Sequence, residues 1–194
     1  FFCSSGSEAN DTAMKMVWYY QAARGKPEKR KIISRRRGYH GVTMAAASMT
    51  ALAYAQNGFG LPLDFFKHTT TPDYYNEGRD GESEAEFTAR CAAELEALII
   101  EEGPETVGAL FAEPVMGAGG VIIPPAGYFA AIREVLERHD VLLVADEVIC
   151  GFGRTGEMWG SQTMDVRPDM LTCAKALSSA YLPISAVLMS DRVY

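Results

Sequence analysis

The sequence predicts an α/β fold, in which helices cover both faces of a largely parallel sheet. Residues 107–112, 141–145 and 170–174 are short, mostly apolar runs without polar alternation, which is typical of strands buried on both sides. Residues 84–101 and 126–139 instead repeat their apolar side chains at helical spacing. Strands and helices that alternate along a chain in this way favour a parallel sheet with helical crossovers.

The first half of the chain has a less regular pattern. Its composition and spacing predict a helix, a short strand, a second helix rich in Ala and Met, and a long surface loop without a clear period. Gly25 and Pro27 end the first helix. In order, these elements are expected at residues 8–24, 32–34, 41–55 and 58–82.

The second half of the chain alternates helices and strands more strictly. The helix at 84–101 is amphipathic, because Phe87, Cys91, Leu95 and Leu98 share one face. The chain contains no internal repeat and no linker, so we expect a single domain. A strand, a helix and three further strands are expected in turn at residues 107–112, 126–139, 141–145, 170–174 and 184–189.

The composition limits the class of protein. With 48% hydrophobic and 22% charged residues, the 194-residue chain is typical of a globular domain with a core of its own. No run approaches the ~20 apolar residues that span a bilayer, so we expect no membrane segment. The net charge of −7 argues against a nucleic-acid partner. The basic run at 35–37 is more typical of a solvated face or a set of ion pairs.

Cysteine and histidine are too scattered to indicate a metal site. The four cysteines form no C-x-x-C pair, and we expect reduced, packed thiols in a cytoplasmic protein. The three histidines lie far apart in the sequence. The chain opens on Phe1 rather than Met and closes near an apolar run at 186–189, which leads us to expect a piece of a longer protein.

Three ionisable residues directly follow apolar strands. Glu113 comes after the strand at 107–112, Asp146 after that at 141–145, and Lys175 after 170–174. Taken singly, such a lysine is usually a surface charge and such an aspartate a turn former. Ligands of open α/β sheets bind at the carboxyl ends of the strands. If these strands are parallel, the three side chains converge on one edge.

That set of residues suits one kind of chemistry. A lysine in an apolar setting loses its proton more easily and can form a Schiff base with an aldehyde. An aspartate can keep a pyridine nitrogen protonated, so that the ring draws electrons from a substrate carbanion. Lys175 and Asp146 are therefore candidates for the two groups that a pyridoxal 5′-phosphate enzyme needs.

Two further segments could hold the rest of such a cofactor. Ser5-Gly6-Ser7 stands at the start of a predicted helix and offers free backbone N–H groups and hydroxyls to a phosphate. Tyr39, in Tyr39-His40-Gly41, offers a flat ring that can stack on the pyridine.

Residues 151–156 match the dinucleotide-binding pattern G-x-G-x-x-G and follow a strand. That function would require a helix to begin there, with an acidic residue about 20 positions further on. The next residues include Gly160 and Pro168 and lack a helical pattern. We expect these glycines to shape a tight loop beside the pocket.

Together these motifs make the sequence similar to the class III aminotransferases, above all to the ω-amino acid:pyruvate (β-alanine:pyruvate) type. The similarity covers essentially the whole chain. The block ADEV…GFGRTG followed by AKAL is specific to this class. The matching blocks are SGSEANDTAMK at 5–15, RRRGYHGVT at 35–43, AEPVMGAGGVIIPPAGYF at 112–129, ADEVICGFGRTG at 145–156 and AKALSSAYLPISAVL at 174–188.

The resemblance implies the fold type I, aspartate aminotransferase-like large domain and a role for each motif residue. Lys175 would be the Schiff-base lysine that also moves the substrate proton, and Asp146 the partner of the pyridine nitrogen. Val148 would pack on the ring face opposite Tyr39, and Glu113 would support the pocket. Relatives often have Thr-Asn where this chain has Cys3-Ser4, a change that should not abolish the phosphate site. The implied cofactor-binding residues are Gly6, Ser7, Tyr39, His40, Glu113, Asp146, Val148 and Lys175.

The resemblance also implies the reaction and what lies beyond the chain. We expect residues 1–194 to be the central part of the large domain, without the N-terminal segment and the C-terminal small domain. The expected reaction is a ping-pong transfer of an amino group from an ω-amino acid or amine to a keto acid such as pyruvate. The expected parent is a homodimer or homotetramer. Decarboxylases and aminomutases on the same scaffold remain alternatives, as does a non-catalytic role for the isolated piece.

Overall fold

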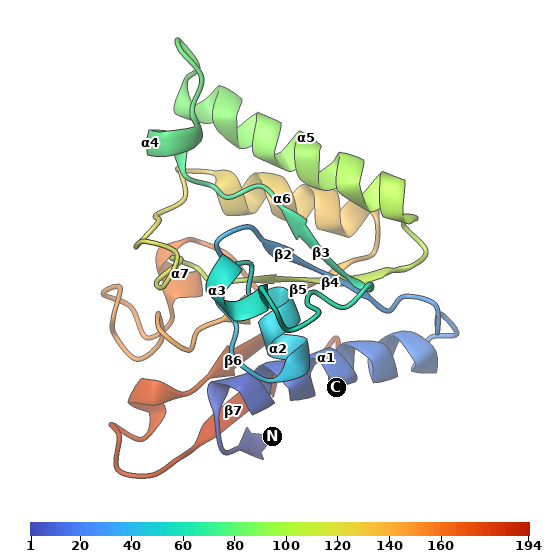
Figure 1. Ribbon diagram of the computed structural model, residues 1–194, viewed down its shortest axis with the longest axis vertical. Coiled ribbons are helices and arrows are strands. Elements are labelled where there is room, and N and C mark those ends of the chain that lie inside the picture. The colour runs from blue at the N-terminus through green and yellow to red at the C-terminus, as the bar shows by residue number, and fades with distance from the viewer.

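A computed structural model describes all 194 residues, and its centre is a seven-stranded sheet of order β1-β7-β6-β5-β4-β2-β3 (Figure 1). The five strands from β6 to β3 run parallel, whereas β7 is antiparallel to both of its neighbours. The predicted fold class, α/β with a largely parallel sheet, is confirmed. The strands are β1 Phe2–Cys3, β2 Lys31–Arg35, β3 Phe66–Thr69, β4 Val107–Ala112, β5 Leu142–Asp146, β6 Met170–Cys173 and β7 Ser185–Met189.

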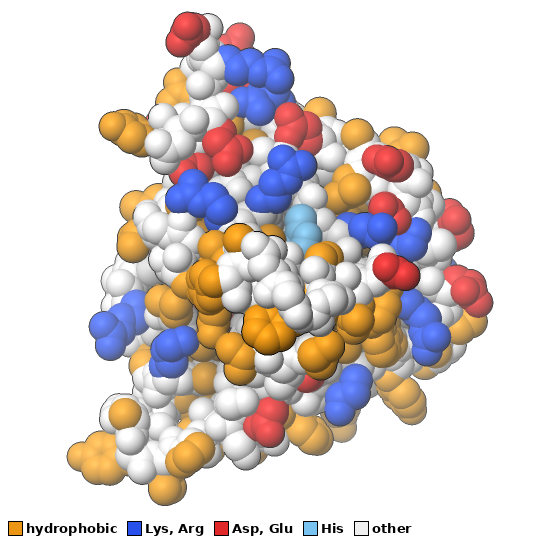
Figure 2. Space-filling view, viewed as in Figure 1, with side chains coloured by type: hydrophobic (Ala, Val, Ile, Leu, Met, Phe, Trp, Pro, Cys, Tyr) orange, Lys and Arg blue, Asp and Glu red, His pale blue; other side chains and the backbone are white.

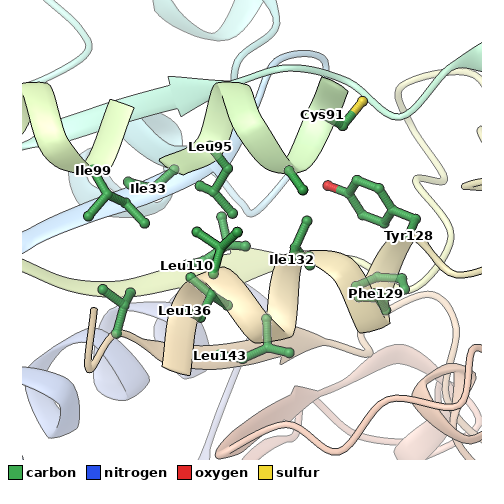
Figure 3. Packing of buried hydrophobic residues seen from close by; sticks show 14 of the residues in the cluster. Ile33, Cys91, Leu95, Ile99, Leu110, Tyr128, Phe129, Ile132, Leu136 and Leu143 are labelled. Carbon is green, nitrogen blue, oxygen red and sulfur yellow. The ribbon is translucent and has the colours of Figure 1, made fainter. Parts of the chain in front are cut away.

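Helices cover both faces of the sheet (Figure 1). Helices α5 Glu84–Glu102 and α6 Tyr128–Arg138 lie on one face, and α1 Gly6–Ala23 and α2 Met44–Met49 lie on the other. Each face has its own buried core, of 17 and 14 residues, and Figure 3 shows how side chains of the first interdigitate. The central strand β4 supplies both cores, because successive strand residues point to opposite faces.

The long helices begin at residues that can satisfy their free N–H groups. Ser83 and Glu86 form a reciprocal capping box at the start of α5, and the Ser5 hydroxyl accepts the Glu8 N–H at the start of α1. Such caps stabilise a helix by about 1 kcal/mol. The expected helices at 8–24 and 84–101 are confirmed.

The expected helix at 41–55 is wrong as a single element. The chain forms α2 and then a separate turn, α3 Ala53–Gln56, and Thr50 between them is extended. The Thr50 hydroxyl accepts the N–H groups of His40 and Gly41, at 2.8 and 3.2 Å. These bonds tie Thr50 back to the preceding loop, so the backbone leaves the helical path there.

The expected loop at 58–82 contains two elements that the sequence did not indicate. Strand β3 pairs in parallel with β2 at the sheet edge, and α4 Tyr74–Glu77 follows it. Strand β3 reads Phe-Lys-His-Thr, with its two middle residues half-buried, so it shows no apolar run. The short helix α7 Gly160–Thr163 and the 3-10 turn η1 Lys175–Leu177 were also not foreseen.

The surface is not uniformly polar. Figure 2 shows hydrophobic side chains gathered near the centre of one face, where Figure 1 places α2 and α3. Exposed apolar residues of that region are Val42, Met44, Tyr54 and Phe59. No helix is both long and apolar enough to cross a membrane.

Candidate active site

The structure places a cavity of about 710 Å³ at the carboxyl ends of the parallel strands β4, β5 and β6. Its walls also include the start of α1, the loop between β2 and α2, and the segment that leads into β7. Segments far apart in the sequence therefore meet here. All eight candidate residues line the cavity: Gly6, Ser7, Tyr39, His40, Glu113, Asp146, Val148 and Lys175.

Asp146, the last residue of β5, is buried at the base of this site. Its Oδ2 lies 2.8 Å from Asn10 Nδ2 and 2.8 Å from His40 Nδ1. Its Oδ1 accepts the Val148 N–H at 3.1 Å. A carboxylate can only accept hydrogen bonds, so these three contacts from donors fix its orientation. Such a group can hold a protonated ring nitrogen.

Glu113 directly follows β4 and is also buried. Its Oε1 accepts the Tyr39 N–H at 3.1 Å and its Oε2 accepts the Gly117 N–H at 3.0 Å. Burial raises the pKa of this carboxyl; His40 acts against that shift and Asp146 adds to it. Through its bond to the Tyr39 backbone, Glu113 fixes the loop that carries the predicted stacking ring.

The start of α1 forms the phosphate-binding candidate. The first N–H groups of a helix have no intrahelical acceptor, so those of Gly6 and Ser7 remain available at the positive end of the helix dipole. A Cβ on Gly6 would lie 3.2 Å from both methyl carbons of Val148. Glycine therefore lets the helix start pack directly against the side chain predicted to contact the ring.

Lys175 opens the 3-10 turn η1 and has a φ of 42°. A positive φ is uncommon for a residue with a side chain and is found mostly where surrounding structure imposes it. Lys175 is exposed on the cavity wall, where Ala174, Ala176, Ser178 and Ser179 lie beside it.

The dinucleotide-like motif at 151–156 forms a loop of turns and bends. Gly153 and Gly156 have φ of 87° and 102°, in the region that favours glycine. Arg154 of this loop lines the cavity. As expected, the glycines shape a loop beside the pocket.

Sequence reasoning missed three buried polar residues behind the site. Asn10 donates to Asp146, and Thr172 donates to Asn10. Arg35 is 1% exposed and donates from Nη2 to the main-chain oxygen of Glu113, so the interpretation of residues 35–37 as a solvated face is wrong for Arg35. Asn10 shares the buried face of α1 with Ala13 and Val17. A polar residue at helical spacing within an apolar face was the available signal.

The model of the family "Aminotransferase class-III" matches residues 1–194. Among curated proteins, "Gamma aminobutyrate transaminase 1, mitochondrial" of Solanum lycopersicum is 55% identical over 193 residues, and "Vanillin aminotransferase" of Capsicum frutescens is 52% identical over 193 residues. Both alignments cover 100% of this chain, but only 38% and 42% of those relatives.

Solved structures give the same result. "Transaminase with L-ala" superimposes with a TM-score of 0.98 at 58% identity, over 100% of this chain and 45% of that one. An omega transaminase from Pseudomonas jessenii "in complex with PMP" has a TM-score of 0.98 at 55% identity, over 100% of this chain and 43% of that one. The chain thus spans less than half the length of these relatives and belongs to the class III aminotransferases.

Proposed function

We propose that the protein carrying this chain is a pyridoxal-phosphate-dependent transaminase, which moves an amino group from an ω-amino acid or amine to a keto acid such as pyruvate. Class III aminotransferases use this cofactor. The observation that carries the proposal is the convergence of Lys175, buried Asp146 and the free start of α1 on one cavity. Similarity to γ-aminobutyrate, vanillin and omega transaminases supports the ω-amine donor class.

The residues present fit the cofactor. The start of α1 offers N–H groups to a phosphate, and the missing Cβ of Gly6 lets that helix start pack directly against the Val148 side chain. Tyr39 and Val148 both line the cavity and supply surfaces for a flat ring. Asp146 offers a buried carboxylate to a ring nitrogen. When bound, pyridoxal phosphate would supply an aldehyde carbon and an electron-drawing ring.

Each of the chain's own residues would then have a separate role. Lys175 would provide the amine that holds the aldehyde and, once freed by the donor, would move a proton from the donor carbon. Asp146 would keep the ring nitrogen protonated throughout. Glu113 would hold the Tyr39 backbone in place. The exposed position of Lys175 supports a cavity that other segments complete, and we propose a homodimer or homotetramer.

Borohydride trapping of the full-length protein tests this function. The protein is mixed with pyridoxal phosphate, reduced, and digested for mass spectrometry. We expect a cofactor adduct on Lys175 that Lys175→Ala lacks, while Lys15→Ala, which changes a lysine outside the cavity, retains it. Absence of the adduct, or unimpaired turnover of Lys175→Ala at equal cofactor loading, would refute the proposal.

A panel of donors with pyruvate then tests the reaction class. We expect alanine to form in equal amounts to the aldehyde or keto product of the donor. Release of carbon dioxide in place of alanine would assign the protein to the decarboxylases of the same scaffold.

A further inference from the structure

A buried chain of hydrogen bonds reaches Asp146 from two residues that do not line the cavity. The Thr172 hydroxyl of β6 donates to Asn10 Oδ1 of α1 at 2.8 Å. Asn10 Nδ2 donates in turn to Asp146 Oδ2 at 2.8 Å and to the main-chain oxygen of His40 at 2.7 Å. Asn10 is 1% exposed and Thr172 is fully buried. Bulk water therefore does not reach these hydrogen bonds in the folded chain.

The partners fix which way the Asn10 amide faces. The His40 carbonyl and the Asp146 carboxylate can only accept hydrogen bonds, so the amide NH₂ must face them. The amide oxygen then faces Thr172, whose hydroxyl must donate. A flipped amide would set its oxygen against two acceptors. The Asn10 side chain thus has one arrangement that satisfies all its neighbours.

The two oxygens of Asp146 differ in the number of hydrogen bonds that they make to the protein. Oδ2 contacts both Asn10 and His40, so protein groups use both of its acceptor positions. Oδ1 accepts only the Val148 N–H, which leaves it one acceptor position. The oxygen with capacity for a ligand is therefore Oδ1.

We propose that Asn10, oriented by Thr172, is a positioning residue that holds Asp146 Oδ2 and thereby presents Oδ1 to the ring nitrogen of the cofactor. The inference rests on the proposed function, since it assigns the means by which Asp146 meets the pyridine ring. Asn10 itself does not line the cavity. It acts by restricting the rotation of a buried carboxylate whose hydrogen bonds are strong in a region of low dielectric.

The test uses the full-length protein with pyridoxal phosphate labelled with ¹⁵N in the ring. Asn10→Leu removes every bond of the amide at similar volume, and Thr172→Val removes only the hydroxyl that orients it. Gln21→Leu is the matched control, because Gln21 is a fully buried amide on the same helix without contact to Asp146. Thr172→Ser restores the hydroxyl and serves as the rescue.

We expect Asn10→Leu to lower kcat ~10- to 100-fold, the range expected for one lost hydrogen bond to a charged group, while KM for pyruvate changes little. The ¹⁵N resonance of the bound ring should move toward that of an unprotonated pyridine. Thr172→Val should shift both measurements in the same direction by a smaller amount, and Thr172→Ser should return them. Gln21→Leu should leave both unchanged.

Unchanged ring ¹⁵N resonances in Asn10→Leu and Thr172→Val, or losses no larger than in Gln21→Leu, would overturn the inference. If Asn10→Leu does not fold, the comparison of Thr172→Val with Thr172→Ser decides. Failure of the proposed function is distinguishable, because the wild-type protein would then form no borohydride adduct on Lys175.

Discussion

Glu113 acts in this fold as a hydrogen-bond acceptor held away from water. Its two oxygens receive the N–H groups of Tyr39 and Gly117, which an exposed carboxylate could not organise so rigidly. Burial is the main cause that raises the pKa of Glu113; His40 lowers it and Asp146 raises it further. Glu113 and Asp146 are thus two buried carboxyl groups of one site that are held by different sets of donors.

The raised pKa of Glu113 predicts how stability depends on pH. The folded state binds this proton more tightly than the unfolded state, so the stabilisation is fully present below the ordinary value of 4.5 and is lost as pH rises through the folded-state value. Glu113→Gln has no such titration. Its side-chain NH₂ would face one of the two buried N–H groups, which would lower the free energy of unfolding by about 1–3 kcal/mol. The free energy of unfolding of Glu113→Gln should therefore be lower than that of wild type, and we expect this deficit to shrink as pH rises above 4.5.

Urea unfolding of wild type and Glu113→Gln at a series of pH values measures this difference directly. A deficit that stays constant or grows as pH rises from 4.5 would contradict the assignment of the raised pKa to Glu113.

The close crossing of two segments shapes the phosphate-binding candidate. The loop between β2 and α2 passes over the first turn of α1, and the Val42 N–H donates to Ser7 Oγ at 3.0 Å. A Cβ on Gly41 would lie 2.3 Å from Ser7 Oγ and 2.9 Å from Ala46 Cβ. Gly41 also has a φ of 134°. Only glycine permits this approach without moving the helix start.

Gly41→Ala should therefore weaken both stability and cofactor binding. Overpacking of this kind costs about 1–3 kcal/mol, and displacement of Ser7 should reduce pyridoxal phosphate affinity ~10-fold through a lost phosphate bond. Gly81→Ala is the control, since Gly81 also has positive φ but no atom within 4 Å of an added Cβ. Equilibrium dialysis and thermal unfolding give the two readouts. Equal affinity in Gly41→Ala and wild type would show that the crossing does not shape the phosphate site.

Element patterns predicted most of this fold and missed features that depend on distant contacts. The helices α1 and α5 follow from helical periodicity, and the strands β4 and β5 follow from continuous apolar runs. The break at Thr50 could not be foreseen, because the hydroxyl that causes it bonds to residues nine and ten positions earlier. Strand β3 has no apolar run, and it forms through parallel backbone pairing with β2.

The residues of the site likewise include some that the sequence predicts and some that it does not. Glu113, Asp146 and Lys175 could be placed because parallel strands bring their carboxyl ends to one edge. Asn10 could not, since its partners Asp146 and Thr172 lie 136 and 162 residues away along the chain. The exposure of Lys175 could not be predicted from its local sequence, because it depends on which segments surround the cavity.

At the scale of the whole molecule, segments from near the two ends of the chain meet at the cavity. Strand β1 pairs with β7, and the Ser185 hydroxyl donates to the main-chain oxygen of Ser5 at 2.6 Å. The phosphate-binding candidate at Ser5–Ser7 is therefore fastened to the last strand.

Cofactor binding should consequently protect several distant segments at once. A ligand present at 100 times its Kd stabilises the folded state by about 2.7 kcal/mol. We expect hydrogen exchange in the full-length protein to slow on addition of pyridoxal phosphate in residues 4–7, 39–41, 146–149 and 174–184, which line the cavity. The turn at 103–106 precedes β4, at the opposite edge of the sheet, and should not change.

Peptide-level mass spectrometry after deuterium labelling resolves these segments. Protection limited to residues 174–184 would mean that Lys175 alone binds the cofactor and that the other walls do not engage it. Equal slowing at 103–106 would mean that binding acts on the whole domain without a defined site. Protection of all four cavity segments, together with an unchanged turn at 103–106, requires a ligand that contacts α1, the loop after β2, the end of β5 and the segment after β6 simultaneously.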